Sequence, residues 1–172
     1  QATAETSGEA QNIEVTKGDG YVFVSFYDAV FFDGNRYELR PDGEEVLQLV
    51  ADALSLASEY IDEVVVMGHT AQASPNAANP VWEDRFLASN RATVAAVFLQ
   101  EHSTIPQARL VVKSFGQWRP VADNDTEENR TKNRRVELMV TGKDLFNELG
   151  DSLQQYQVQR SGEAHLTTKE PA

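Results

Sequence analysis

The sequence predicts an α+β fold, a sandwich in which the helices pack on one face of a mixed β-sheet. Short segments with strand-like hydrophobic patterns alternate with two long segments of helical periodicity, and the last two strand-like segments are consecutive. A sheet with a hydrophobic face needs a layer of helices to cover it. The expected order is β-(β)-α-β-α-β-β, in which the strand in parentheses is only a short apolar run.

The first half of the chain supplies the first strands and the first helix. Residues 21–26 (YVFVSF) alternate as a half-buried strand does, and 29–32 (AVFF) form the short apolar run. Apolar residues then recur at helical spacing from Pro41 to Ala57, and proline suits the first turn of a helix. Residues 63–68 (EVVVMG) are β-branched and nearly all apolar, which predicts a strand covered on both faces.

The second half repeats this alternation. A second helix is expected from about Asp84 to His102, followed by a strand over 108–116 (ARLVVKSFG). Residues 124–133 begin with residues that cap helices, so they can hold one helical turn. Residues 134–140 (RRVELMV) alternate again and predict the last strand.

Composition divides the chain into three parts. Residues 1–19 are rich in small polar residues and predict a flexible N-terminal linker. Residues 20–142 contain the predicted strands and helices and form the domain. Residues 143–172 predict a short helix over 143–151, followed by a polar tail.

Charge and cysteine content exclude several classes of function. The net charge is −12, so the phosphate backbone of a nucleic acid would repel the protein, and no nucleic-acid partner is expected. Cysteine is absent, which excludes disulfides and thiol chemistry. No apolar run approaches the ~20 residues of a membrane helix.

The histidines do not form a catalytic or metal-binding pattern. His69 ends a strand, His102 ends a helix and His165 lies in the tail, so no pair has the close spacing of metal ligands. No glycine-rich phosphate loop is present. We therefore predict a protein that is not an enzyme, with no catalytic residues, no metal site and no cofactor.

Polar groups that could bind a ligand stand at strand ends and on the second helix. Gly68, His69 and Thr70 follow a buried strand, where ligand-binding loops often begin. Arg91 precedes an apolar helix segment, where its guanidinium can hold a carboxylate by two hydrogen bonds. The alternative for Arg91 is a surface ion pair, for instance with Glu83 or Asp84.

Two consecutive arginines open the last strand. Arg134 and Arg135 should face opposite sides of the sheet, because side chains alternate along a strand. One of them is then placed near a ligand and the other in solvent. The alternative is an edge-strand charge that discourages aggregation.

Three segments together resemble the OmpA-like peptidoglycan-binding domain family. They are VVVMGHT, then LASNRATVAAVFL, then SFGQWRPVADNDTEENRTKNRRVELMV, in the order and spacing of the family. The family pattern has a strand that ends in G-H-T-D, a helix with L-S-x-x-R-A, and N-R-R-V before the last strand. The resemblance covers about residues 20–141 and implies a β-α-β-α-β-β sandwich.

Within that family, GDGYVFVSFYDAVFFDGNRYELRPDG most resembles flagellar stator proteins of the MotB type. This resemblance implies a cell-wall anchor outside the cytoplasmic membrane that forms a homodimer. It also implies a membrane helix outside these 172 residues and a stator partner of the MotA type. The alternatives are another OmpA-like envelope protein, and a dimerisation or docking scaffold without peptidoglycan binding.

The family site is carried over residue by residue. In the family, an aspartate and an arginine hold the charged ends of the diaminopimelate side chain of the wall peptide. The arginine is present as Arg91 and the threonine of G-H-T as Thr70, whereas the aspartate position holds Ala71. The family asparagine seven residues before the arginine is Asp84 here, and a loop aspartate falls on Asn35.

The alanine leaves three interpretations of the site open. Asp84 can supply the missing carboxylate from the start of the helix. The domain can bind a different wall peptide, or bind weakly. Alternatively, the domain has lost wall binding.

Overall fold

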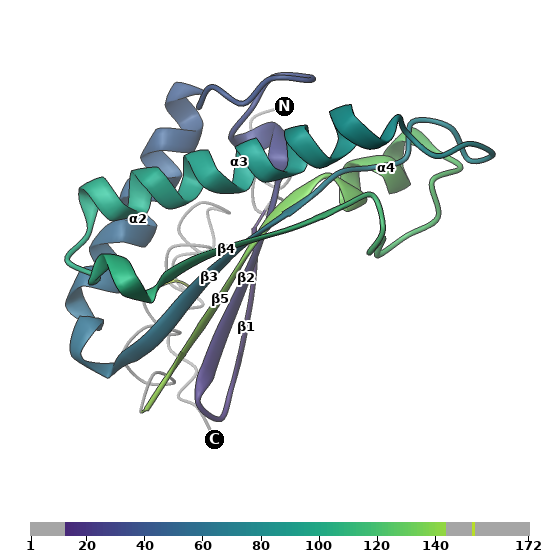
Figure 1. The fold of residues 1–172 in the computed structure, drawn as a ribbon. Helices are drawn as coiled ribbons and strands as arrows, with labels where there is room; N and C mark the ends of the chain where they lie inside the picture. Colours follow the sequence, from purple (N-terminus) through teal and green to yellow (C-terminus); the bar gives the residue numbers. More distant parts are fainter. Residues whose placement is uncertain (1–12, 144–152, 154–172) are drawn as a thin grey trace, which may run out of the picture.

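The computed structural model describes residues 13–143 and Leu153. They form one five-stranded mixed sheet with the strand order β1-β2-β5-β3-β4, and α2 and α3 lie over one of its faces (Figure 1). The fold class predicted from the sequence is confirmed. The elements are β1 (Ile13–Gly18), β2 (Tyr21–Tyr27), η1 (Asp28–Val30), α2 (Pro41–Leu56), η2 (Ser58–Tyr60), β3 (Ile61–His69), α3 (Val81–His102), η3 (Gln107–Arg109), β4 (Leu110–Gly116), α4 (Glu127–Asn133) and β5 (Arg135–Gly142).

The last strand, β5, lies in the middle of the sheet. It pairs antiparallel with both β2 and β3, while β3 and β4 are parallel. Arg135 at the start of β5 stands opposite Tyr27 at the end of β2 and opposite His69 at the end of β3. The residues that follow β2 and β3 and the residue that precedes β5 therefore meet at one edge of the sheet.

The folded part begins earlier than the sequence predicted. Residues 13–18, which we assigned to the flexible linker, form β1 and pair with β2 in register from Ile13↔Phe26 to Gly18↔Tyr21. The turn between the two strands is Asp19-Gly20, and Gly20 has a φ of 76°. An Asp-Gly pair between two strands is a strong hairpin signal, because glycine tolerates positive φ.

The short apolar run after β2 is not a strand. Residues 28–30 form the 3-10 helix η1, and the Asp28 carbonyl accepts the N–H groups of Phe31 at 2.9 Å and Phe32 at 2.8 Å. These hydrogen bonds turn the chain away from the sheet. The Phe31 side chain is fully buried, and its ring lies 5.1 Å from that of Phe26. The apolar character of 29–32 thus reflects burial under the helices instead of strand pairing.

Small residues hold α3 close to the sheet. Ala88, Ala92 and Ala95 are completely buried. Gly68 of β3 lies directly beneath the first two, because an added Cβ would stand 2.1 Å from the Ala88 carbonyl oxygen. The helix begins at Val81, slightly before the predicted start at Asp84.

The structure describes only two residues of the predicted C-terminal part, Lys143 and Leu153. The predicted helix over 143–151 lies outside the described residues, apart from Lys143. Leu153, assigned to the polar tail, is 4% exposed and belongs to the hydrophobic core. Among the described helices, none combines the length and the apolar character needed to cross a membrane.

Candidate ligand-binding site

Residues that follow β2 and β3 line a pocket of about 570 Å³ together with the first turns of α3. All five residues predicted for the site line this pocket, namely Asn35, Thr70, Ala71, Asp84 and Arg91. Its other charged lining residues are Asp28, Asp33, Glu83, Glu127 and Arg134. The sheet register explains this convergence, since it brings the two strand ends and the start of β5 to the same edge.

Arg91 lies beneath the pocket and is 3% exposed. Its guanidinium forms an ion pair with Asp28 through Nη1. Nε donates to the Arg36 carbonyl at 2.8 Å, and Nη2 donates to the Asp33 carbonyl at 3.0 Å. The guanidinium also lies 5.1 Å from the centre of the Phe32 ring. Arg91 therefore fastens the loop after β2 to α3.

The partner of Arg91 is an acid that the sequence analysis did not select. A surface ion pair with Glu83 or Asp84, one of the two sequence interpretations, is wrong, because Arg91 is buried and pairs with Asp28. Burial raises the pKa of Asp28, and the charges of Arg91 and Arg134 oppose that rise. Burial likewise lowers the pKa of Arg91, against the attraction of Asp28. Its position directly after a strand was the only sequence signal for Asp28.

Asp84 is 4% exposed, and its carboxylate is engaged within the protein. Oδ1 accepts hydrogen bonds from the Thr70 hydroxyl and, at 3.0 Å, from the Asn79 side-chain amide. Oδ2 accepts the backbone N–H of Gln117 at 3.1 Å. These donors belong to the end of β3, the loop before α3 and the end of β4. Asp84 thus holds three segments together at the base of the pocket.

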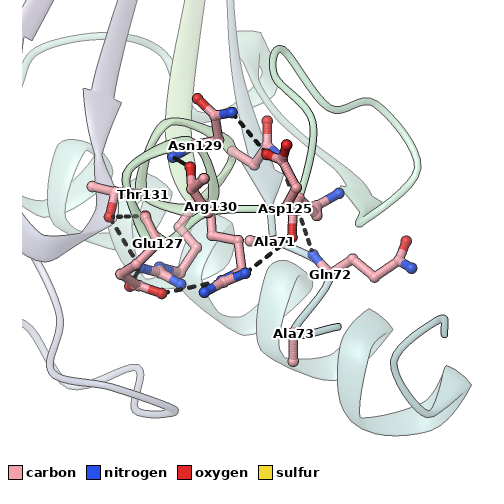
Figure 2. Close-up of polar contacts among 12 residues, drawn as sticks. Ala71, Gln72, Ala73, Asp125, Glu127, Asn129, Arg130 and Thr131 are labelled. Atoms are coloured by element: carbon pink, nitrogen blue, oxygen red, sulfur yellow. Dashed lines mark hydrogen bonds and ion pairs between the residues drawn. The ribbon is translucent and has the colours of Figure 1, made fainter. Parts of the chain in front are cut away.

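Ala71 begins the loop between β3 and α3. Its carbonyl accepts a hydrogen bond from Asn79 Nδ2 at 2.8 Å, and the N–H of Gln72 donates to Asn124 Oδ1 at 3.1 Å. Figure 2 shows Ala71 and Gln72 beside Arg130 of α4, which donates to the Asn124 carbonyl at 3.0 Å. The loop is thereby held against α4, and the Ala71 methyl group lines the pocket at the position where the sequence resemblance expects a carboxylate.

Arg134 lines the pocket from the side of α4. It forms an ion pair with Glu127 and donates to the Thr131 hydroxyl at 3.1 Å. Hydrogen bonds from Arg134 and Arg130, together with their charges, lower the pKa of Glu127, and the bond from Arg134 contributes most. The two consecutive arginines do lie apart, as predicted, but Arg135 is buried and not in solvent.

His69 belongs to a different cluster, on the opposite face of the sheet. Since Gly68 contacts α3, strand alternation directs His69 away from the helices. His69 pairs with Glu137, which also accepts a hydrogen bond from Arg135 Nε at 3.1 Å. Burial raises the pKa of Glu137, but the hydrogen bond from His69 and the charge of Arg135 outweigh it and lower the pKa overall. Thr70 is the only residue of the G-H-T motif that lines the pocket.

The groups that line the pocket can bind a polar or charged ligand. The described residues that line it include carboxylates, guanidiniums, amides and one hydroxyl, but no histidine, lysine, cysteine or serine. That hydroxyl, on Thr70, donates to a buried carboxylate. Across residues 13–143 and Leu153, no group of three potential ligands is placed to hold a metal ion.

Comparisons with known sequences place the domain in a family. The model of the OmpA family matches residues 31–134. The outer-membrane lipoprotein YfiB of Pseudomonas aeruginosa is 38% identical over 111 residues, which are 64% of this chain and 61% of that protein. Motility protein B of Bacillus subtilis is 25% identical over 119 residues, which are 69% of this chain and 44% of that protein. The chain thus spans less than two thirds of either relative.

Solved structures share the fold. The cell wall anchor of the type VI secretion system (T6SS) from Pseudomonas aeruginosa is similar with a TM-score of 0.67 at 23% identity, over 83% of this chain and 96% of that one. The periplasmic domain of Helicobacter pylori MotB is similar with a TM-score of 0.63 at 20% identity, over 84% of this chain and 91% of that one. The family model covers more than half of the chain, and its match includes every residue of the predicted site. The chain belongs to the OmpA family.

Proposed function

We propose that this domain is a non-enzymatic anchor of the bacterial cell envelope that binds the peptide of peptidoglycan in the pocket. The observation that carries the proposal is the convergence of Asn35, Thr70, Ala71, Asp84 and Arg91 on one pocket. These positions lie far apart in sequence, and the sequence resemblance assigns the family's ligand site to them. The names of relatives support a place outside the cytoplasmic membrane, since one is an outer-membrane lipoprotein and another a cell wall anchor.

The proposal is tested by sedimentation with purified peptidoglycan. We expect the wild-type domain to sediment with the wall material, and Ala71→Asp to bind about tenfold more tightly, because it adds a carboxylate where the pocket now has a methyl group. The matched control is Ala108→Asp, because Ala108 is exposed and does not line the pocket. If the wild-type domain stays in the supernatant at every concentration tested, the proposal fails and the scaffold alternative gains support.

We also propose that the domain serves as the wall anchor of a MotB-type stator subunit, as a homodimer with a MotA-type partner. The similarity to motility protein B supports this assignment. The higher identity to YfiB supports the alternative, an envelope lipoprotein of the same fold. Deleting the gene should abolish swimming in soft agar while flagella still assemble, and plasmid-borne wild type should restore it. Normal swimming of the deletion strain would favour the lipoprotein alternative.

A further inference from the structure

Asp28 is the ion-pair partner of Arg91, whose guanidinium the family resemblance assigns to a carboxylate of the ligand. The other two nitrogens of this guanidinium donate to the carbonyls of Asp33 and Arg36. Each guanidinium nitrogen therefore has an acceptor within the protein. A ligand carboxylate that approached Arg91 would also meet the negative charge of Asp28, and like charges in a partly buried site repel each other strongly.

The charges that line the pocket are mostly negative. Its lining contains five carboxylates, from Asp28, Asp33, Glu83, Asp84 and Glu127, against two guanidiniums, an excess of three negative charges. Asp28 and Asp84 are engaged beneath the surface. The other three face solvent. Asp33, whose side chain is 72% exposed, lies 3.8 Å from Arg40, and Glu127, which is 66% exposed, pairs with Arg130 at 3.1 Å and with Arg134. Glu83 is exposed, and no ion pair joins it to another of the described residues. A cationic group in the pocket would interact with this rim.

The second guanidinium of the pocket is also paired. Arg134 forms an ion pair with Glu127 and donates to Thr131. A ligand carboxylate there would compete with Glu127, which already neutralises the charge of Arg134. An ammonium group meets no such competition, because it can join the carboxylates that already line the pocket.

We infer that the pocket prefers a wall-peptide side chain that ends in an ammonium group without a neighbouring carboxylate. Lysine has this chemistry, and so does diaminopimelate whose free side-chain carboxyl is amidated. Unmodified diaminopimelate carries the additional carboxylate and is disfavoured. This inference rests on the proposed function, because it names the ligand class of the same site.

The test compares three synthetic tripeptides, L-Ala-γ-D-Glu-X, by isothermal titration calorimetry with the wild-type protein. X is L-lysine, amidated meso-diaminopimelate or unmodified meso-diaminopimelate. We expect the first two to bind about tenfold more tightly than the third, because of the charge repulsion at Asp28. Equal or tighter binding of the unmodified peptide overturns the inference but leaves wall binding intact. Failure of all three peptides to bind contradicts the proposed function itself.

Two substitutions test the cause of the preference. Asp28→Asn removes the internal carboxylate, so the unmodified diaminopimelate peptide should bind about tenfold more tightly. The difference in affinity between this peptide and the other two should become smaller. Glu83→Gln should weaken binding of the lysine peptide about threefold, whereas Glu101→Gln, an exposed glutamate at the far end of α3, should not change it. A thermal melt checks that each variant is folded. An unchanged preference in folded Asp28→Asn would overturn the role given to Asp28, and the wild-type comparison remains decisive if that variant does not fold.

Discussion

Replacing Gly68 with alanine is expected to lower the free energy of unfolding by about 3 kcal/mol, at the upper end for overpacking. A Cβ at Gly68 would lie 2.1 Å from the Ala88 carbonyl oxygen and 3.1 Å from the Ala92 Cβ. The first contact is with the backbone of a long helix, which cannot move aside as a flexible side chain can. The helix must shift away from β3, which breaks its packing on the sheet. Urea unfolding of the two proteins measures the difference.

The same shift should disturb the pocket, because α3 carries Asp84, Leu87 and Arg91 on its lining. We therefore expect Gly68→Ala to weaken sedimentation with peptidoglycan as well as stability. Gly34→Ala is the control for stability alone, since an added Cβ there has no atom within 4 Å but Gly34 lines the pocket. Its stability should stay within about 0.5 kcal/mol of wild type. A Gly68→Ala variant as stable as the control would show that α3 can adjust without cost.

Replacing Arg91 with leucine is expected to lower the free energy of unfolding by about 4 kcal/mol, because it leaves the buried Asp28 carboxylate without its partner. The loop after β2 also loses two hydrogen bonds, from Nε to Arg36 and from Nη2 to Asp33. Urea unfolding again provides the measurement. Wall binding should fall with it, since this loop lines the pocket.

The double variant Asp28→Leu/Arg91→Leu separates the ion pair from simple loss of packing. When both charges of a buried pair are replaced by apolar residues, the cost is smaller than when one is removed, because no uncompensated charge remains. The double variant should thus be more stable than Arg91→Leu alone by at least about 1 kcal/mol. If the two substitutions simply add, Asp28 and Arg91 are not energetically coupled and the ion pair has little importance for the fold.

Much of the fold could be predicted from periodicity, since burial on one side of a helix or strand leaves a local pattern. The strands over 21–26, 63–68, 108–116 and 134–140 were found in this way, and so were both long helices.

Two segments were assigned wrongly for identifiable reasons. Residues 13–18 have few large apolar side chains, although the Asp19-Gly20 turn marks a hairpin. Residues 29–32 are apolar because they pack under helices, which a short run cannot distinguish from a strand.

The sequence by itself identified the family and most of the strands and helices, because short motifs and local periodicity carry that information, and it supplied the residues proposed for the site. The tertiary structure alone decided which charges meet. Asp28 and Arg91 are 63 residues apart, and they pair because β5 lies between β2 and β3 and α3 packs above that edge. The sequence does not show whether an arginine is exposed or buried. Only a buried arginine requires an ion-pair partner, because an unpaired charge in the interior is costly. The family arginine therefore acts in this fold as the counter-ion of Asp28.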